Sequence, residues 1–433
     1  MSALRTRIIA LAATAAVVAG SAVTALVAWP ASPPPGPAAD FETPPDGAPW
    51  LPEVVSDAAQ YPAAWGSMNE ALRAKDRETF LSYAEGDARE QLALWWDNTT
   101  KIGWATAYIL PATGPDGEEA ALLGAGLGFE QRPVRGGGNA DAGYRLTHGF
   151  GYDITTSGDG EDMRITSIEP QAPMPWDEGE IHVARREHVV LYGMADERDV
   201  VEANVDVAEE AARLALATIT DVGGETPMVG FVSGITDDAE RMHRWEYGDG
   251  GAEWEMEVAG YAQPALRPPA RSDFLEDDIA TGDETSAVLM MLGPLSADQR
   301  LETFLHEFAH GLHFAAAPLP SHAQPPTAVF EGFAVYAEVA SGVAPREMFG
   351  YPEVTDAIAR EGIATFSDEN LRDEDAWIGY VAAGSYFAFL ADTGGDPWQL
   401  AIDGIDASEP DLVEIVGDER FSEAAWQTWI ATR

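Results

Sequence analysis

The longest uninterrupted apolar stretch of the chain lies close to its N-terminus. Residues 8–29 carry no charged side chain, Arg5 and Arg7 precede them, and the first acidic residue after them is Asp40. The length of this run is close to the ~20 residues that cross a bilayer as a helix. Basic residues before the run and acidic residues after it predict that the body of the protein lies outside the cytoplasm.

The end of this apolar run decides between an anchor and a cleaved signal peptide. Cleaved signals have a shorter apolar core and end in a pair of small residues. Here the run ends in Val27-Ala28-Trp29-Pro30, which is a poor cleavage site. We therefore expect residues 1–29 to be an uncleaved signal anchor, with secretion after cleavage as the alternative. Residues 30–50 are rich in Pro and Ala, which predicts an extended linker.

Residues 51–176 show helix periodicity first and strand alternation afterwards. The spacing of apolar residues predicts mainly helix over Ala63–Asp97, with a break at Glu85-Gly86-Asp87. Four alternating segments follow, separated by turns rich in Gly, Asp and Pro: 104–110, 120–130, 144–152 and 163–169. Helices followed by an antiparallel sheet form an α+β domain. His148 and Asp153 in this sheet are interpreted as ordinary strand residues.

Residues 177–433 read as a second α+β domain, with a small mixed sheet followed by helices. Predicted strands cover 181–192 (a strand or hairpin), 228–232, 257–261 and 287–292. Predicted helices cover 196–221, a segment opening at Ser296, 329–341, 380–390 and 424–432.

Charge narrows the choice of partners. The chain has 25 Lys and Arg against 73 Asp and Glu, a net charge of -48. A nucleic acid or an anionic lipid surface would be repelled, so we expect membrane contact through the N-terminal segment alone. Solubility is the favoured interpretation of the acidity, with selection for basic substrates as the alternative. There is no cysteine, which excludes disulfides, thiolate metal ligands and a cysteine nucleophile.

The strongest chemical signal is His306-Glu307-Phe308-Ala309-His310, an H-E-x-x-H sequence inside a predicted helix. Histidines four apart lie one turn from each other on one face, where both can hold one zinc ion. Glu307 between them can take a proton from a water bound to that zinc. The sequence therefore predicts one Zn²⁺ with His306 and His310 as ligands and Glu307 as general base.

A catalytic zinc site needs a third protein ligand, and three residues are candidates. His313 lies on nearly the same helix face as His310 but cannot easily wrap round the same ion. His322 lies in the proline-rich segment 317–326 and could approach. Glu331 lies on the next predicted helix, in Glu331-Gly-Phe-Ala-Val-Tyr-Ala-Glu338.

The pair of motifs HEFAH and EGFAVYAE resembles the gluzincin peptidases, in particular the peptidase-MA-like branch related to the M1 aminopeptidases. The resemblance implies a gluzincin-like fold over residues 177–433, with Glu331 as the third zinc ligand. It also implies that Glu338 hydrogen-bonds a ligand histidine. Tyr380, ahead of a segment rich in small residues, corresponds to the family's oxyanion donor, and Tyr386 is the alternative.

Three further expectations follow from resemblance. In the family, an edge strand just before the motif helix pairs with the substrate backbone, and 287–292 occupies that place. The glutamate motif G-x-M-E-N of M1 aminopeptidases is absent there, so aminopeptidase specificity is not supported. The first domain, residues 51–176, resembles cystatin-like or NTF2-like domains in its pattern of elements.

We therefore expect an extracytoplasmic zinc metallopeptidase acting on a peptide or protein. One alternative is a non-catalytic, membrane-anchored binding or assembly protein that keeps a structural zinc site. Another is that the first domain captures a ligand and is the functional part.

Overall fold

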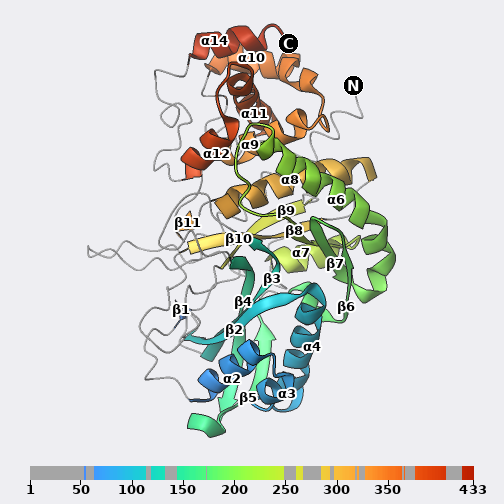
Figure 1. The fold of residues 1–433 in the computed structure, drawn as a ribbon, viewed down its shortest axis with the longest axis vertical. Coiled ribbons are helices and arrows are strands. Elements are labelled where there is room, and N and C mark those ends of the chain that lie inside the picture. Colours follow the sequence, from blue (N-terminus) through green and yellow to red (C-terminus); the bar gives the residue numbers. More distant parts are fainter. Residues whose placement is uncertain are drawn as a thin grey trace, which may run out of the picture.

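The computed structural model describes residues 53–54, 63–113, 119–131, 144–171, 173–247, 260–266, 284–292, 297–316, 319–320, 327–362, 365, 376–405 and 422–433. These residues form an elongated mixed helix-and-sheet protein, with an antiparallel sheet and its helices at one end and a group of helices at the other (Figure 1). Among these residues there is no helix with the length and apolar character needed to span a bilayer. The predicted anchor and linker, residues 1–50, lie outside the described residues.

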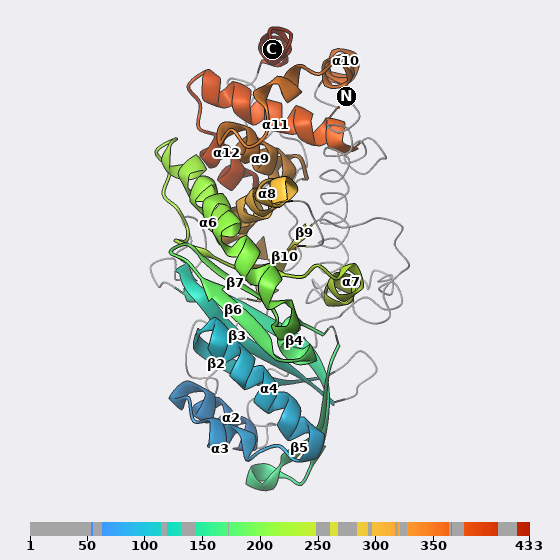
Figure 2. The same cartoon turned by 90° about the vertical axis from the view of Figure 1, so that its right-hand side faces the viewer.

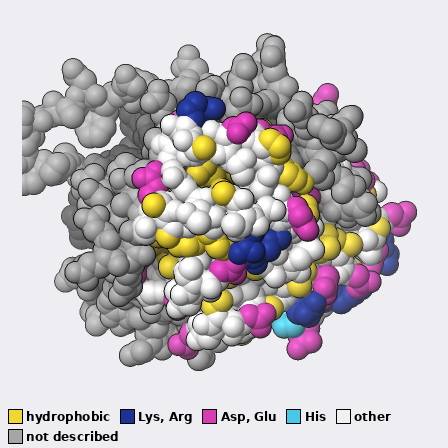
Figure 3. Space-filling view, turned by 90° about the horizontal axis from the view of Figure 1, so that it is seen from above, with side chains coloured by type: hydrophobic (Ala, Val, Ile, Leu, Met, Phe, Trp, Pro, Cys, Tyr) yellow, Lys and Arg dark blue, Asp and Glu magenta, His cyan; other side chains and the backbone are white. Residues whose placement is uncertain are grey.

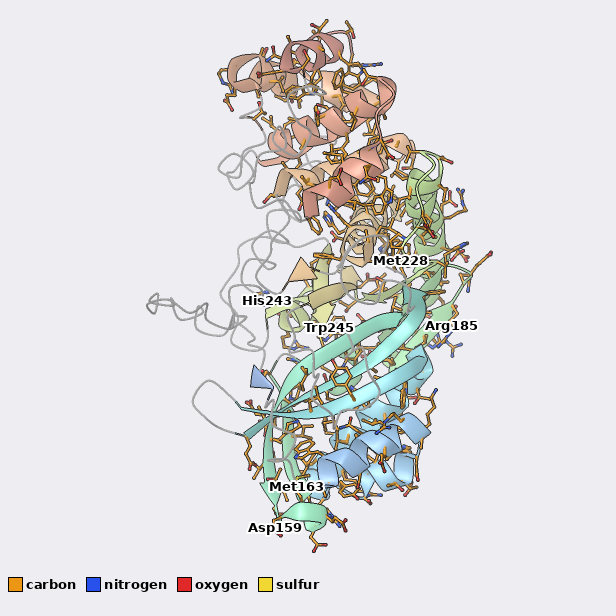
Figure 4. All side chains as sticks on the ribbon, turned by 60° about the vertical axis from the view of Figure 1, so that its left-hand side comes forward. Asp159, Met163, Arg185, Met228, His243 and Trp245 are labelled. Atoms are coloured by element: carbon orange, nitrogen blue, oxygen red, sulfur yellow. The ribbon has the colours of Figure 1, made fainter. Side chains whose placement is uncertain are left out.

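The first part of the chain has the predicted α+β order. Its sheet runs β1-β2-β3-β4-β5 with every neighbouring pair antiparallel. The elements are α2 (Ala63–Ala74), α3 (Arg77–Leu81), α4 (Gly86–Ile102), β1 (Glu53–Val54), β2 (Trp104–Thr113), β3 (Glu119–Gln131), β4 (Tyr144–Ser157) and β5 (Arg164–Pro170). The four predicted strands are confirmed. Asp159 and Met163, just before β5, mark the far tip of this part (Figure 4).

The helical segment of this part is interrupted twice. The break predicted at Glu85–Asp87 is confirmed, because α4 begins at Gly86. A second break, which the sequence pattern did not predict, lies at Lys75, whose φ is 55°. Asp76 then caps α3 by accepting a hydrogen bond from the backbone N–H of Thr79 at 3.1 Å. This turn folds α2 and α3 against each other over one end of the sheet (Figure 2).

The second sheet has the strand order β11-β10-β8-β7-β6, with β9 on the other side of β10. β6 and β7 form an antiparallel hairpin, β7, β8 and β10 run parallel, and β9 is antiparallel to β10. The strands are β6 (Ile181–Arg185), β7 (Val189–Met194), β8 (Phe231–Ile235), β9 (Gly260–Leu266), β10 (Glu284–Leu292) and β11 (Leu319–Pro320). Helix α6 (Arg198–Thr220) connects the parallel strands β7 and β8, and lies along the sheet (Figure 2).

Two strand positions differ from the sequence-based expectation. β8 begins three residues later than the predicted 228–232, because pairing with β7 sets its register, as with Val189 opposite Phe231. The first residues of the predicted strand 257–261 lie outside the described residues, and β9 covers Gly260–Leu266. The prediction that the strand 287–292 lies at an edge of the sheet is also wrong. β9 pairs with β10 along its length and β8 pairs with Met290–Leu292, so β10 is interior and β9 lies outside it.

The helical end follows β10 in the sequence. It contains α8 (Ala297–Ala316), α9 (Thr327–Ala340), α10 (Pro352–Glu361), α11 (Ala376–Asp392), α12 (Pro397–Ile405) and α14 (Glu423–Ile430). The predicted helices at 329–341, 380–390 and 424–432 are confirmed within a few residues. α10 falls in the stretch between 341 and 380, whose pattern is that of a polar helix, whereas α12 was not predicted. Every residue from Ala328 to Val339 is buried, so α9 is the central helix of this group. From above, this end shows acidic side chains scattered among uncharged ones and a few basic side chains (Figure 3).

Two glycines allow α9 and α11 to pack closely. A Cβ at Gly332 of α9 would lie 2.9 Å from Phe387 and 3.0 Å from Ala383. A Cβ at Gly384 of α11 would lie 2.6 Å from Val335. A methyl group at either position would push the helices apart. The close crossing fixes the position of α9 relative to α11, and with it the position of Glu331.

Hydrogen bonds from buried side chains fasten the two parts of the chain together. Asn98 of α4 donates to the carbonyl oxygens of Trp176 and Gly179, at 3.1 and 2.6 Å, and accepts from the N–H of Ile181. Tyr152 of β4 donates to Asp177 Oδ1 at 2.9 Å. Both contacts hold the segment that contains α5 (Pro175–Glu178) and enters β6. In Figure 4, Arg185, at the end of β6, lies beside this junction.

Candidate metal centre

Two neighbouring helices bring His306, His310 and Glu331 together. The two histidines are one turn apart on α8, and Glu331 comes from α9. His306 Nε2 lies 3.2 Å from Glu331 Oε2, and His310 Nε2 lies 3.6 Å from the same oxygen. One ligand atom from each residue falls within 4.8 Å of the others. The three residues therefore form a group that could bind a metal ion.

The other two candidates for the third ligand do not join this group in the described structure. His313 points to α12, where its Nε2 donates to the carbonyl oxygen of Ala401 at 2.7 Å. Burial lowers the pKa of His313 to about 3, so this side chain is neutral. His322 lies outside the described residues.

Glu338 contacts the far side of His306. Its Oε1 lies 2.6 Å from His306 Nδ1, and both side chains are 2% exposed. Glu338 follows Glu331 by two helical turns, so both carboxylates lie on one face of α9. An acceptor at Nδ1 holds the proton there and leaves the Nε2 lone pair directed at the ligand group. The contact that resemblance suggested for Glu338 is present.

The charges in this group favour a bound cation. Burial lowers the pKa of His306, but hydrogen bonds to Glu331 and Glu338 outweigh burial and hold it well above its ordinary value. Burial would raise the pKa of Glu331, yet His310 and His306 keep it below its usual range. Burial lowers the pKa of His310 to about 4. Two buried carboxylates beside two imidazoles thus need positive charge, which a proton or a metal ion can supply.

The donor set fits zinc. Two imidazole nitrogens and one carboxylate oxygen are a common protein ligand set for catalytic Zn²⁺. Within the described residues, His310 Nε2 and Glu331 Oε1 make no hydrogen bond although both are buried. Buried polar atoms of this kind call for a partner such as an ion.

The structure places Glu307 on α8, and Tyr380 and Tyr386 on two faces of α11. Glu307 is on α8 directly beside His306 and is 2% exposed. Tyr380 is three and four residues before Ala383 and Gly384, the α11 positions that contact α9, so it shares their helix face. Tyr386 lies on another face, with its ring 6.3 Å from that of Trp426 in α14. Of the two tyrosines, Tyr380 is on the side of α11 that packs on α9.

One neighbour of the group was not foreseen from the sequence. The ring of Phe330 stacks on the imidazole of His310 with centroids 3.8 Å apart and planes 5° from parallel. Phe330 immediately precedes Glu331 on α9, and this adjacency to a candidate ligand is the feature of the sequence that pointed to its place beside the group.

Residues of the hairpin and α6 form a second cluster, made by Glu187, His188 and Glu209. Glu209 accepts hydrogen bonds there from the backbone N–H of His188 at 2.8 Å and contacts its Nδ1 at 2.7 Å. The cluster is partly exposed, and its central carboxylate already has two protein partners. It is better explained as a structural contact that holds the β6–β7 hairpin against α6.

Comparisons with known proteins add no relative. No protein-family model matches the chain, and no curated protein is significantly similar to it. The geometry of the α8–α9 group is therefore the main indication of function.

Proposed function

We propose that this protein is a zinc-dependent peptidase of the gluzincin type that hydrolyses peptide bonds outside the cytoplasm. The observation that carries the proposal is the convergence of His306, His310 and Glu331 from two helices, with Glu307 beside them. The N-terminal apolar run supports an anchored protein, with a secreted form as the alternative.

Each residue of the group has a part in the proposed reaction. His306, His310 and Glu331 would hold the zinc ion, which supplies Lewis-acid polarisation of a water and of the scissile carbonyl. Glu307 takes a proton from the attacking water as the new C–O bond forms. It then gives that proton to the leaving amine as the C–N bond breaks. The phenol of Tyr380 donates a hydrogen bond to the negative charge that develops on the carbonyl oxygen.

The second sheet supports a peptide as the substrate. β9 lies next to β10 at the outer side of the described sheet and is antiparallel to it. An extended peptide can add to such a strand through main-chain hydrogen bonds. The expected substrate-pairing strand is thus β9 rather than 287–292.

Deep burial of the group favours a second candidate function, a zinc site that is structural. The ligand side chains and Glu307 are at most 2% exposed. A site with no water position would hold metal without catalysing hydrolysis. The protein would then be an anchored binding or assembly module.

Metal analysis combined with cleavage of a peptide library separates these functions. The full-length protein and Glu307→Gln are compared, because glutamine keeps the shape of the side chain but cannot act as a base. The peptidase proposal expects one zinc in both proteins and cleavage by the wild type alone. Zinc in both without any cleavage identifies the structural site, and equal cleavage by both rejects Glu307 as the base.

A further inference from the structure

The two histidines of the candidate centre are held in different ways. His306 has a carboxylate oxygen 2.6 Å from its Nδ1, contributed by Glu338. His310 Nδ1 has no hydrogen-bond partner among the described residues, although the side chain is completely buried. Metal-bound histidines almost always donate this second N–H to an acceptor, which fixes the ring plane. Within the part of the chain that the structure describes, a contact of another kind orients His310.

Phe330 covers the face of His310. Its ring is 3.8 Å from the imidazole, centroid to centroid, with an angle of 5° between the planes. The imidazole of His306 meets His310 edge-on at 4.6 Å and 90°. A flat ring in face contact resists rotation of His310 about its side-chain bonds, since tilting would drive one ring into the other.

Phe330 is itself held in place from behind. The ring of His313 lies 5.5 Å from it at 26°, and the ring of Phe314 lies 4.9 Å from it at 61°. His313 is fixed in turn by its hydrogen bond to the carbonyl oxygen of Ala401. The stack therefore runs from α12 through His313 and Phe330 to His310, and it has little freedom to shift.

We propose that Phe330 is a positioning residue that sets the plane of His310 by stacking, in the role that a hydrogen-bond acceptor has for His306. This inference rests on the proposed zinc centre but does not require that the centre hydrolyse peptides. Among the described residues no acceptor at Nδ1 adds to the basicity of His310, which makes it the weaker of the two imidazole ligands. Loss of His310 would then be the first step in the release of a bound zinc ion, and the stack with Phe330 would slow it.

Zinc release into excess chelator tests this role in the zinc-loaded full-length protein. Phe330→Leu keeps an apolar side chain but removes the flat face, and the release rate should rise about tenfold or more. Phe330→Tyr keeps the face and should release zinc at nearly the wild-type rate. The absorption spectrum of the Co²⁺ form should change in the leucine variant and stay unchanged in the tyrosine variant.

Phe333→Leu is the matched control. Phe333 lies one turn along α9, is 1% exposed, and packs on His313, Phe387 and Trp398. It should lower the melting temperature of the zinc-free protein as Phe330→Leu does, without faster zinc release. Equal release rates in the two leucine variants would overturn the proposal.

A replacement variant and two results with the wild-type protein complete the test. Phe330→Met, which approximates the volume of phenylalanine with a flexible chain, replaces the leucine variant if that variant fails to fold, and fast release is again expected. A wild-type protein that binds no zinc rejects the proposed centre, and the positioning role with it. A protein that binds zinc but cleaves no peptide rejects the peptidase function alone.

Discussion

Glu338 Oε1 lies 2.6 Å from His306 Nδ1, on the side of the imidazole opposite Glu331. One helix, α9, thereby supplies both the carboxylate that would bind the metal and the carboxylate that orients a histidine ligand. Their spacing of two helical turns means that a single rigid element sets both contacts.

Removing the Glu338 carboxylate should weaken zinc binding. Glu338→Ala leaves His306 Nδ1 without its acceptor, and we expect the zinc affinity to fall by about 10- to 100-fold. Glu338→Gln keeps an oxygen acceptor without the charge, so its loss should be smaller. Competition with a chromophoric chelator measures both. Wild-type affinity in the alanine variant would show that the contact does not support the site.

The two tyrosines of α11 should differ in their effect on catalysis. Tyr380→Phe removes the proposed donor to the developing oxyanion, and kcat should fall by about 10²- to 10³-fold with little change in KM. Tyr386→Phe is the control, because Tyr386 packs toward Trp426. Steady-state kinetics on one cleaved peptide compares them. The reverse ranking would move the oxyanion donor to Tyr386.

Ionisation of Asp177 should lower the free energy of unfolding as the pH rises. Burial, offset in part by hydrogen bonds from Tyr152 and Met174, raises the pKa of Asp177 from 3.8 to about 7. The folded state then holds a proton that the unfolded state releases. The resulting stabilisation is complete below about pH 3.8 and is lost as the pH rises through about 7, up to about 4 kcal/mol in all.

Asp177→Asn removes this titration and should make the free energy of unfolding depend less on pH. Denaturant unfolding of both proteins at several pH values between 5 and 8.5 measures the difference. We expect the stability of the variant, relative to wild type, to increase with pH across this window. A constant difference would mean that Asp177 titrates alike in the folded and unfolded states.

The close crossing of α9 and α11 should not tolerate a methyl group. Gly384→Ala places a Cβ 2.6 Å from Val335, and we expect a loss of about 1–3 kcal/mol in the free energy of unfolding. Displacement of α9 should also lower zinc affinity, because Glu331 and Glu338 move with it. Gly66→Ala is the control, since nothing lies within 4 Å of the added Cβ in α2.

The control glycine should behave in the opposite way. Alanine is favoured over glycine inside a helix by roughly 0.5–1 kcal/mol, so Gly66→Ala should be neutral or stabilising. Thermal unfolding and chelator competition compare the two variants. Similar losses in both would show that the crossing is not tight.

Local periodicity was enough to predict the helices that carry the centre. The spacing of His306 and His310 fixes their relation within α8, and both the helix and its burial follow from the apolar residues around them. Glu331 and Glu338 were assigned from a motif, and their relation to each other is likewise set by helix geometry. What they contact depends on how α8 and α9 pack, and the structure brings all four side chains together.

Features that depend on distant contacts were missed or misplaced. β8 starts where its pairing with β7 begins, which no local alternation specifies. The interior position of β10 follows from strand order across the whole sheet. In the sequence, Phe330 cannot be distinguished from an ordinary buried aromatic residue. Its stacking on His310 depends on how α8 and α9 pack against each other.

The location of Glu331 on a separate helix from His306 and His310 has a mechanical consequence. An ion bound by all three would cross-link α8 to α9 and close the intervening segment of chain into a loop. By analogy with a disulfide closing a loop of that size, such a link restricts the unfolded chain by about 3 kcal/mol. Because the chain has no cysteine, a disulfide cannot join these helices, and a bound metal ion would serve as the cross-link between them.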